Sequence, residues 1–147
     1  MKGVDASSRA LGLELQILNA GTERDFEPTF ARLVQPRTAG LLITANPVFN
    51  SRAHELAALT LKHAVPAVHA VREFAMAGGL MSYGGNIRES HKQAGIYTGR
   101  ILKGEKPASL PVQLATKVEL YVNLKTAKAL GINIPNTLIG RADEVIE

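Results

Sequence analysis

The chain has 147 residues, of which 46% are hydrophobic and 20% are charged, so it can bury a core and is too apolar to be disordered. Its longest apolar stretches, such as residues 40–45 and 64–71, are far too short to cross a bilayer, and without cysteine it can form neither disulfides nor thiolate metal sites. The net charge of +4 is scattered, without the basic stripe and neighbouring aromatic residues of nucleic-acid-binding proteins, so we expect no nucleic-acid partner.

The N-terminal residues predict a helix followed by a strand. Residues 5–11 form the end of a helix that Gly12 closes, and residues 13–18 alternate apolar and polar side chains with the period of a strand. A chain that opens within a helix and then enters a strand is expected to lack the strand that should come first. The opening residues also lack the apolar core and the cleavage site of a secretory signal.

Alternating helices and strands continue along the first half of the chain. Thr22 caps a helix over residues 23–35, with Asp25 at the capping-box position. One face of this helix is apolar and holds Phe26, Phe30, Leu33 and Val34.

Two short apolar runs then predict buried parallel strands, at residues 40–44 and within residues 64–71. A loop at residues 45–50 and a helix capped by Asn50 and ending near His63 connect them. Together with the strand at 13–18, this order predicts an α/β three-layer sandwich, a mainly parallel, doubly wound sheet with helices on both faces.

The second half predicts a strand at residues 80–83, a helix from Asn86 to about residue 102, and a late strand at 118–122. Asn123 caps a further helix over residues 124–130. After Pro135 we expect a short closing helix that runs to Ile146 and carries Asp143 and Glu144 on a polar face.

The loop at residues 44–50 is a candidate ligand site, because ligands of open α/β sheets bind beyond the carboxyl ends of the strands. It offers the Thr44 hydroxyl, the Asn46 and Asn50 amides and the Phe49 ring, which together suit a small polar organic ligand. A structural interpretation is equally good: Thr44 ends a strand, Asn50 caps a helix and Phe49 fills a gap in the core.

A second candidate is the segment Ser82-Tyr83-Gly84-Gly85, which precedes the helix capped by Asn86. Paired glycines before a helix let backbone amides approach an anionic group, so a carboxylate is a natural ligand there. The same pair is also ordinary turn chemistry, and the segment lacks the lysine of a P-loop and the spacing of a dinucleotide-binding fingerprint.

Glu73 follows a predicted strand directly and is a third candidate, suited to pairing with a ligand amine, although a surface salt bridge with Arg72 or a neighbour is the favoured role. No arrangement of residues suggests catalysis. The four histidines lack the spacing of a metal site, and Ser82 is not in a Gly-x-Ser-x-Gly elbow. We therefore expect a protein that is not an enzyme and that needs no cofactor.

Several motifs together resemble one family. They are the runs AGGLMSYGGN at residues 77–86, QAGIYTGRILKGEKP at 93–107, LPVQ at 110–113, NLKTAKALG at 123–131 and RADEVI at 141–146. The upstream part, from residues 10–14 to 71–74, resembles the same proteins in register. The family is that of ABC-transporter substrate-binding proteins, similar to the tryptophan/tyrosine-type members with a type I periplasmic-binding fold.

The resemblance implies a two-lobed protein about twice as long, exported to the periplasm, that captures a small polar or amino-acid-like ligand for an ABC permease. Without an export signal, the chain as given would stay in the cytoplasm. By resemblance, residues 1–79 belong to the second lobe, without its first strand. Residues 80–110 cross toward the missing first lobe, and residues 111–147 return to the second lobe and form its C-terminal helices.

The same resemblance places residues 44–50, 73 and 82–85 on the cleft between the lobes, with Asn46 and Tyr83 as the preferred contacts. Three alternatives stay open: a remnant that no longer binds, a cytoplasmic ligand-sensing regulatory domain of the same fold, and an enzyme on a flavodoxin-like sheet. Because the helix at 86–102 has no lobe of its own to dock on, we also expect a homodimer in which residues 80–102 pack on the other subunit.

Overall fold

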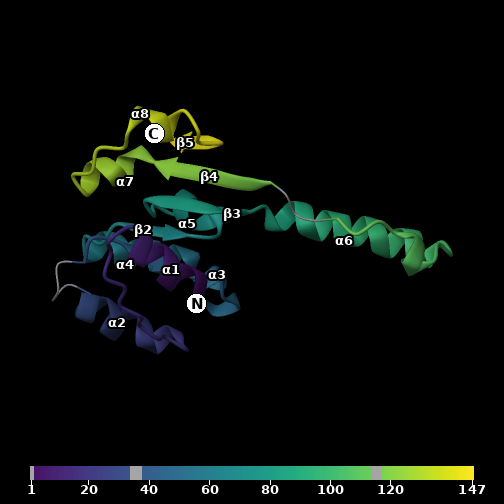
Figure 1. Cartoon of the computed structure of the whole chain (residues 1–147), viewed down its shortest axis with the longest axis horizontal. Helices are drawn as coiled ribbons and strands as arrows, with labels where there is room; N and C mark the ends of the chain where they lie inside the picture. The colour runs from purple at the N-terminus through teal and green to yellow at the C-terminus, as the bar shows by residue number, and fades with distance from the viewer. Residues whose placement is uncertain (1, 34–37, 114–116) are drawn as a thin grey trace.

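The computed structural model describes residues 2–33, 38–113 and 117–147 and is built around one five-stranded sheet (Figure 1). The strands lie in the order β1-β2-β3-β4-β5, which are β1 (Leu41–Ile43), β2 (Ala67–His69), β3 (Met81–Gly85), β4 (Val118–Asn123) and β5 (Glu144–Ile146). All neighbouring pairs are parallel except β3 and β4, which are antiparallel. The predicted α/β fold with a mainly parallel sheet is confirmed.

Helices flank this sheet. They are α1 (Lys2–Ala10), α2 (Phe26–Leu33), α3 (Pro47–Ser51), α4 (Ala53–Lys62), α5 (Arg72–Met76), α6 (Ile87–Leu102), α7 (Leu124–Ala129) and α8 (Asn136–Ile139). None of the helices in the described part of the chain combines the length and the apolar character needed to cross a bilayer.

Local sequence signals set several of the helix ends as predicted. Gly12 adopts a left-handed φ of 68° just after α1, a conformation that favours glycine. Thr22 and Asp25 form a capping box before the short 3₁₀ turn that leads into α2. The side chains of Asn86 and Asn123 cap α6 and α7 by accepting from the Glu89 and Thr126 amides, at 3.0 Å in both cases.

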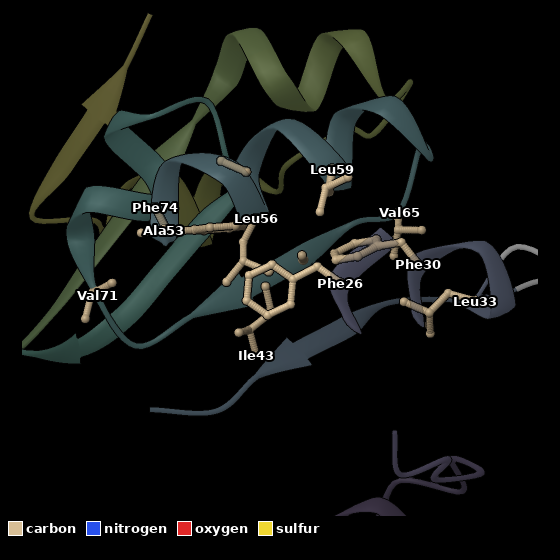
Figure 2. Close-up of a cluster of buried hydrophobic side chains, with 12 residues drawn as sticks. Phe26, Phe30, Leu33, Ile43, Ala53, Leu56, Leu59, Val65, Val71 and Phe74 are labelled. Carbon is tan, nitrogen blue, oxygen red and sulfur yellow. The ribbon is translucent and has the colours of Figure 1, made fainter. Parts of the chain in front are cut away.

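The main core lies between α2, α4 and α5 and one face of the sheet (Figure 2). Phe26, Phe30 and Leu33 are spaced along one side of α2, so the amphipathic pattern of that helix places them all in the core. Ile43 and Phe74 reach the same cluster from β1 and α5. Val34, predicted on the same face, lies outside the described residues.

The predicted strand at residues 13–18 is wrong, because this segment pairs with no strand in the described part of the chain. Its apolar side chains are largely exposed: Leu13 by 58%, Leu15 by 40% and Ile17 by 52%. An alternating apolar and polar pattern is compatible with a strand. A strand forms, however, only where a neighbouring strand makes hydrogen bonds with its backbone amides and carbonyls. Among the described residues, no strand pairs with this segment.

The predicted closing helix to Ile146 is also wrong, because α8 is short and β5 follows it. The Asp143 carboxylate accepts from the Leu120 amide at 2.9 Å, and the Asp143 amide donates to the Leu120 carbonyl at 2.8 Å. These two bonds fix the chain beside β4, where the β-branched Val145 and Ile146 extend the sheet.

Helix α6 projects away from the rest of the molecule, with the returning chain beside it (Figure 1). None of its residues is buried, although the predicted helix itself is confirmed. The Tyr97 hydroxyl donates to the Pro111 carbonyl at 2.6 Å and joins the helix to the returning chain. We call residues 86–113 the arm. The division into segments 1–79, 80–110 and 111–147 stays a prediction.

Candidate functional site

A small, shallow hollow that is partly open to solvent, with a cavity volume of about 20 Å³, lies where β2 and β3 end. The junction between β2 and α5 contributes Arg72 and Glu73, and the junction between β3 and α6 contributes Gly84 and Asn86. Tyr121 reaches it from the antiparallel strand β4. This is the edge at which open α/β sheets bind ligands, because the loops after parallel strands meet there.

Positive charge dominates one wall of the hollow. Nη1 of Arg72 donates to the Tyr121 hydroxyl at 3.3 Å, and this bond raises the pKa of the guanidinium. A carboxylate oxygen of Glu73 lies 3.7 Å from Nε of Arg72 and 3.6 Å from Nη2 of Arg88. Both ion pairs are long and partly solvent-exposed, so a ligand carboxylate can compete with Glu73 for the two arginines.

The opposite wall is an acidic and amide network centred on Glu119. Its carboxylate accepts from Nδ2 of Asn86 at 3.1 Å and from the Tyr121 hydroxyl at 3.3 Å. The bond from Asn86 is the main reason that the pKa of Glu119 lies below its ordinary value. Glu119 is therefore ionised at neutral pH. The Tyr121 hydroxyl thus joins a cation to an anion, because it accepts from Arg72 and donates to Glu119.

Ser82 adds an unused hydroxyl to this hollow. Its side chain is only 1% exposed, and its Oγ has no hydrogen-bond partner in the described part of the chain. Nε of Arg72 is likewise buried without a hydrogen bond there. Buried polar groups are normally paired. Two donors without hydrogen bonds in the described part of the chain line one hollow, and they favour an acceptor-rich ligand such as a carboxylate.

Gly84 allows two backbone segments to meet at the floor of the hollow. A Cβ atom on Gly84 would lie 2.0 Å from the Ala70 carbonyl oxygen, so no larger residue fits without a backbone shift. A Cβ on the adjacent Gly85 would meet no atom within 4 Å. Of the two glycines predicted at this site, only Gly84 is required by the packing.

His69 lies under the same junction and is fully buried. Its Nδ1 accepts from the Ala70 amide at 2.6 Å, which requires an unprotonated nitrogen. Burial lowers the pKa of the ring, and this effect outweighs the opposing influence of the Phe49 carbonyl. The histidine is neutral in the folded protein and helps to hold the Ala70 backbone that borders the hollow.

We expect His69 to make the protein less stable in acid. Because the folded pKa is below the unfolded value, only the unfolded state takes up a proton as the pH falls below about 6.5, and the free energy of unfolding falls by at most about 1.4 kcal/mol per pH unit. Urea unfolding at pH 7.5 and pH 5 measures this change. His69→Asn keeps an acceptor and should flatten the dependence, whereas His54→Asn, at an exposed position of α4, should not. Equal slopes for all three proteins would contradict this role.

Only some of the residues predicted from the sequence as ligand contacts lie in the hollow. Glu73, Ser82, Gly84 and Gly85 line the hollow. Tyr83 does not, because it alternates with Ser82 along β3 and is 61% exposed on the other face.

The predicted loop at residues 44–50 lies outside the hollow. Asn50 is not the helix cap: Asn46 caps α3 by accepting from the Val48 amide at 2.8 Å, and the short α3 already contains Asn50. The Phe49 ring packs against Phe26 with centroids 5.8 Å apart, as the structural interpretation of this loop expects. Thr44 is exposed after β1.

Sequence reasoning missed Arg72, Asn86, Arg88, Glu119 and Tyr121 as site residues. Arg72 offered a signal, since it directly follows a predicted strand. Glu119 and Tyr121 offered none, because only the antiparallel pairing of β4 with β3 brings them to this edge. No group of three or more potential metal ligands occurs among residues 2–33, 38–113 and 117–147.

A comparison with protein-family profiles identifies one family. A sequence profile described as ABC transporter substrate binding protein matches residues 1–146. No curated protein matches the chain significantly.

Among solved structures, a conserved domain protein from Vibrio cholerae O1 biovar El Tor is 22% identical, with a TM-score of 0.85 over 98% of this chain and 48% of its own. An ABC domain from Streptococcus pneumoniae in complex with L-Trp is 21% identical, with a TM-score of 0.84 over 99% of this chain and 50% of its own. A ligand-free, open substrate-binding protein with adhesive properties from Clostridium difficile is 19% identical, with a TM-score of 0.65 over 99% and 48%.

The chain thus spans about half the length of these similar structures. Their likeness shows the fold, and the profile match over almost every residue shows the family. The chain belongs to the ABC transporter substrate-binding protein family.

Proposed function

We propose that this chain forms part of a solute receptor for an ABC importer and that the hollow binds the carboxylate of a small amino-acid-like ligand. The observation that carries the proposal is the buried, unpaired hydroxyl of Ser82 in a hollow that also contains Arg72. The ionised Glu119 on the facing wall suits the ammonium group of such a ligand. The family and the L-Trp complex of a similar protein support this ligand class.

In this role the protein makes and breaks no bond. It binds its ligand outside the cytoplasmic membrane and presents it to a permease. Asn46 and Tyr83 stay predicted contacts, to be tested by alanine substitution at the equivalent positions of an intact two-lobed relative. The open hollow encloses little of a ligand, so we expect residues 1–147 alone to bind weakly.

Binding by this chain is best measured by NMR titration with L-tryptophan, because chemical shifts detect weak complexes. We expect shifts in the amides of residues 70–73, 82–86 and 119–121. Tryptamine lacks the carboxylate and indole-3-propionate lacks the ammonium, so each should bind more weakly. Arg72→Met should lower affinity roughly 10-fold or more, since hydrogen bonds to charged groups contribute about 1.5–3 kcal/mol.

The matched control is Arg52→Met, which removes an arginine that pairs with Glu23 on the surface, away from the hollow. Its affinity should be unchanged. Equal binding of tryptamine and L-tryptophan, or shifts confined to other faces of the protein, would contradict a carboxylate site. Mass spectrometry of small molecules carried by the purified protein would then give the ligand class directly.

We also propose that two copies associate through the arm. One face of α6 holds Ile87, Ala94, Tyr97 and Ile101, and Ile87 is 46% and Ile101 40% exposed. Moving a fully exposed side chain of this kind out of water contributes about 1.5–3 kcal/mol, so covering the exposed part of each contributes a fraction of that. Packing of residues 80–102 on a second subunit would cover these side chains. Light scattering at micromolar concentration should show two chains per particle, and a stable monomer would exclude this arrangement.

A further inference from the structure

His69 is the last residue of β2 and directly precedes the junction with α5 (residues 70–71), which borders the hollow. It is fully buried, and in the register of the sheet it lies between Ile43 of β1 and Ser82 of β3. Phe74 of α5 packs against its ring, with centroids 5.6 Å apart. A titratable side chain is therefore enclosed in the sheet at the point where the hollow begins.

One ring nitrogen of His69 determines the path of the backbone at this junction. Nδ1 accepts from the Ala70 amide at 2.6 Å, and the Val71 amide lies 3.4 Å from the same nitrogen. An acceptor that meets the next two amides turns the chain, as the side chains of Asn and Asp do in tight turns. Because Nδ1 accepts, the ring proton is on Nε2, which makes no hydrogen bond in the described part of the chain.

The peptide group between Ala70 and Val71 connects His69 to the floor of the hollow. The Val71 N–H and the Ala70 carbonyl belong to this one planar unit and point in opposite directions. The amide side faces the His69 ring. On the carbonyl side, Gly84 packs so closely that a Cβ atom there would lie 2.0 Å from the oxygen. A rotation of this peptide group would therefore change the shape of the hollow.

A proton on Nδ1 is incompatible with this arrangement. An imidazolium ring has N–H donors on both nitrogens, so Nδ1–H would face the N–H groups of Ala70 and Val71. Either the ring must leave its position or the peptide groups must rotate before His69 takes up the proton. Both movements disturb the junction.

The surroundings of the ring provide no charge that could compensate the proton. Ile43, Ser82 and Phe74 approach it from β1, β3 and α5, and the Phe49 carbonyl approaches it from α3. None of these groups is ionisable. Burial lowers the pKa of His69 and the Phe49 carbonyl opposes this effect, whereas no charged side chain in the described ranges contributes. A charged ring buried without a counter-charge is strongly unfavourable.

We propose that His69 is an acid-sensitive switch for the hollow: the junction has its ligand-binding shape only while the ring is unprotonated, and in acid it opens and releases the ligand while the rest of the sheet stays folded. The release of ligand rests on the carboxylate site proposed above, whereas the opening of the junction does not. Because the pKa of His69 in the closed junction lies below its ordinary value of 6.5, the closed form is stable above that pH and loses stability as the pH falls.

The first experiment follows the full chain by NMR from pH 8 to pH 5 without ligand. The Cε1–H resonance of His69 gives the protonation of the ring, and the amides of Ala70, Val71 and Gly84 report the shape of the junction. We expect all four signals to change with one midpoint below pH 6.5. The far-UV circular dichroism and the amides of α8, which contains no titratable side chain, should stay constant.

The second experiment measures the affinity for L-tryptophan over the same range. At one pH unit below the midpoint the affinity should have fallen about 10-fold, because binding then requires the release of one proton. Glu119 stays ionised throughout, since the bond from Asn86 holds its pKa below 4.5. The fall in affinity therefore does not come from loss of its charge.

His69→Asn separates titration from a purely structural role of this side chain. Its amide oxygen accepts from backbone amides but does not titrate, so the ratio of its affinities at pH 7.5 and in acid should stay near 1, whatever each affinity is. The matched controls are His54→Asn, at an exposed position of α4, and His63→Asn, whose Nε2 lies 3.3 Å from a Glu27 carboxylate oxygen away from the hollow. Both should lose affinity in acid as the unsubstituted chain does.

The switch is excluded by junction amides that stay unchanged while His69 titrates, or by unfolding of the whole protein at the same midpoint. It is also excluded by a His69→Asn variant that loses affinity in acid as strongly as the two controls. The ligand-free titration uses the unsubstituted chain, so it decides the question even when His69→Asn does not fold. Absence of L-tryptophan binding at every pH would contradict the carboxylate site, and the same titration would then decide alone whether the junction opens.

Discussion

Replacing Phe74 by alanine is expected to lower the free energy of unfolding by about 3–5 kcal/mol, the usual effect of removing a fully buried phenylalanine ring. Phe74 is 0% exposed and lies against the ring of His69 with centroids 5.6 Å apart. It also covers Gly79, where a Cβ atom would lie 2.2 Å from the Phe74 ring. The ring therefore anchors the short helix α5, which carries Arg72 and Glu73 into the hollow.

Chemical denaturation measures this loss, and a thermal scan should show a fall in melting temperature of roughly 6–20 °C for a domain of this size. Phe74→Leu keeps most of the volume and should be less destabilising than Phe74→Ala. Met76→Ala, on the same helix but 55% exposed, should change the stability by less than about 0.5 kcal/mol. Equal effects of Phe74→Ala and Met76→Ala would show that the ring does not anchor α5.

Gly84→Ala is expected to lower the free energy of unfolding by about 1–3 kcal/mol or more, as overpacking does in rigid surroundings. The new methyl would lie 2.0 Å from the Ala70 carbonyl oxygen. This oxygen is backbone and cannot rotate away, so β3 must separate from the β2–α5 junction. Since the hollow lies between these segments, its affinity for L-tryptophan should fall as well.

Gly85→Ala is the matched control, one residue further along the same strand. Its methyl group would meet no atom within 4 Å, and the residue has no positive φ. It should leave the stability nearly unchanged, or raise it slightly because alanine restricts the unfolded chain. If both variants lost stability equally, flexibility at the strand end, not contact with Ala70, would explain why glycines occur there.

The sequence predicted those parts of the fold that depend on local signals. The ends of α1, α6 and α7 follow from Gly12, Asn86 and Asn123, because each signal acts within one helical turn. The strands β1 and β2 follow from short apolar runs, but the prediction that both are fully buried is wrong for β1, because Leu42 is 54% exposed. Residues 13–18 show the limit of such signals, since their pattern is that of a strand but they pair with no strand in the part of the chain that the structure describes.

The site was only partly predictable for a similar reason. Ser82, Gly84 and Glu73 lie at the ends of parallel strands, where the fold class alone places ligand sites. Glu119 and Tyr121 lie near them only because β4 pairs antiparallel with β3 after the arm. Nothing in the spacing of residues reveals a pairing between positions so far apart in the chain.

The arm lies between two strands that are neighbours in the sheet. Gly85 and Val118 are paired, so β3 and β4 form a hairpin whose turn has been replaced by about 32 residues. Closing a flexible loop of that length costs only about 2.5 kcal/mol more than closing a two-residue turn, because the entropy grows with the logarithm of length. None of the residues of α6 is buried, so the sheet gains nothing from its particular length. The hairpin is therefore a place where this fold can accept whole additional segments, and evolution can lengthen or exchange them without redesigning the core.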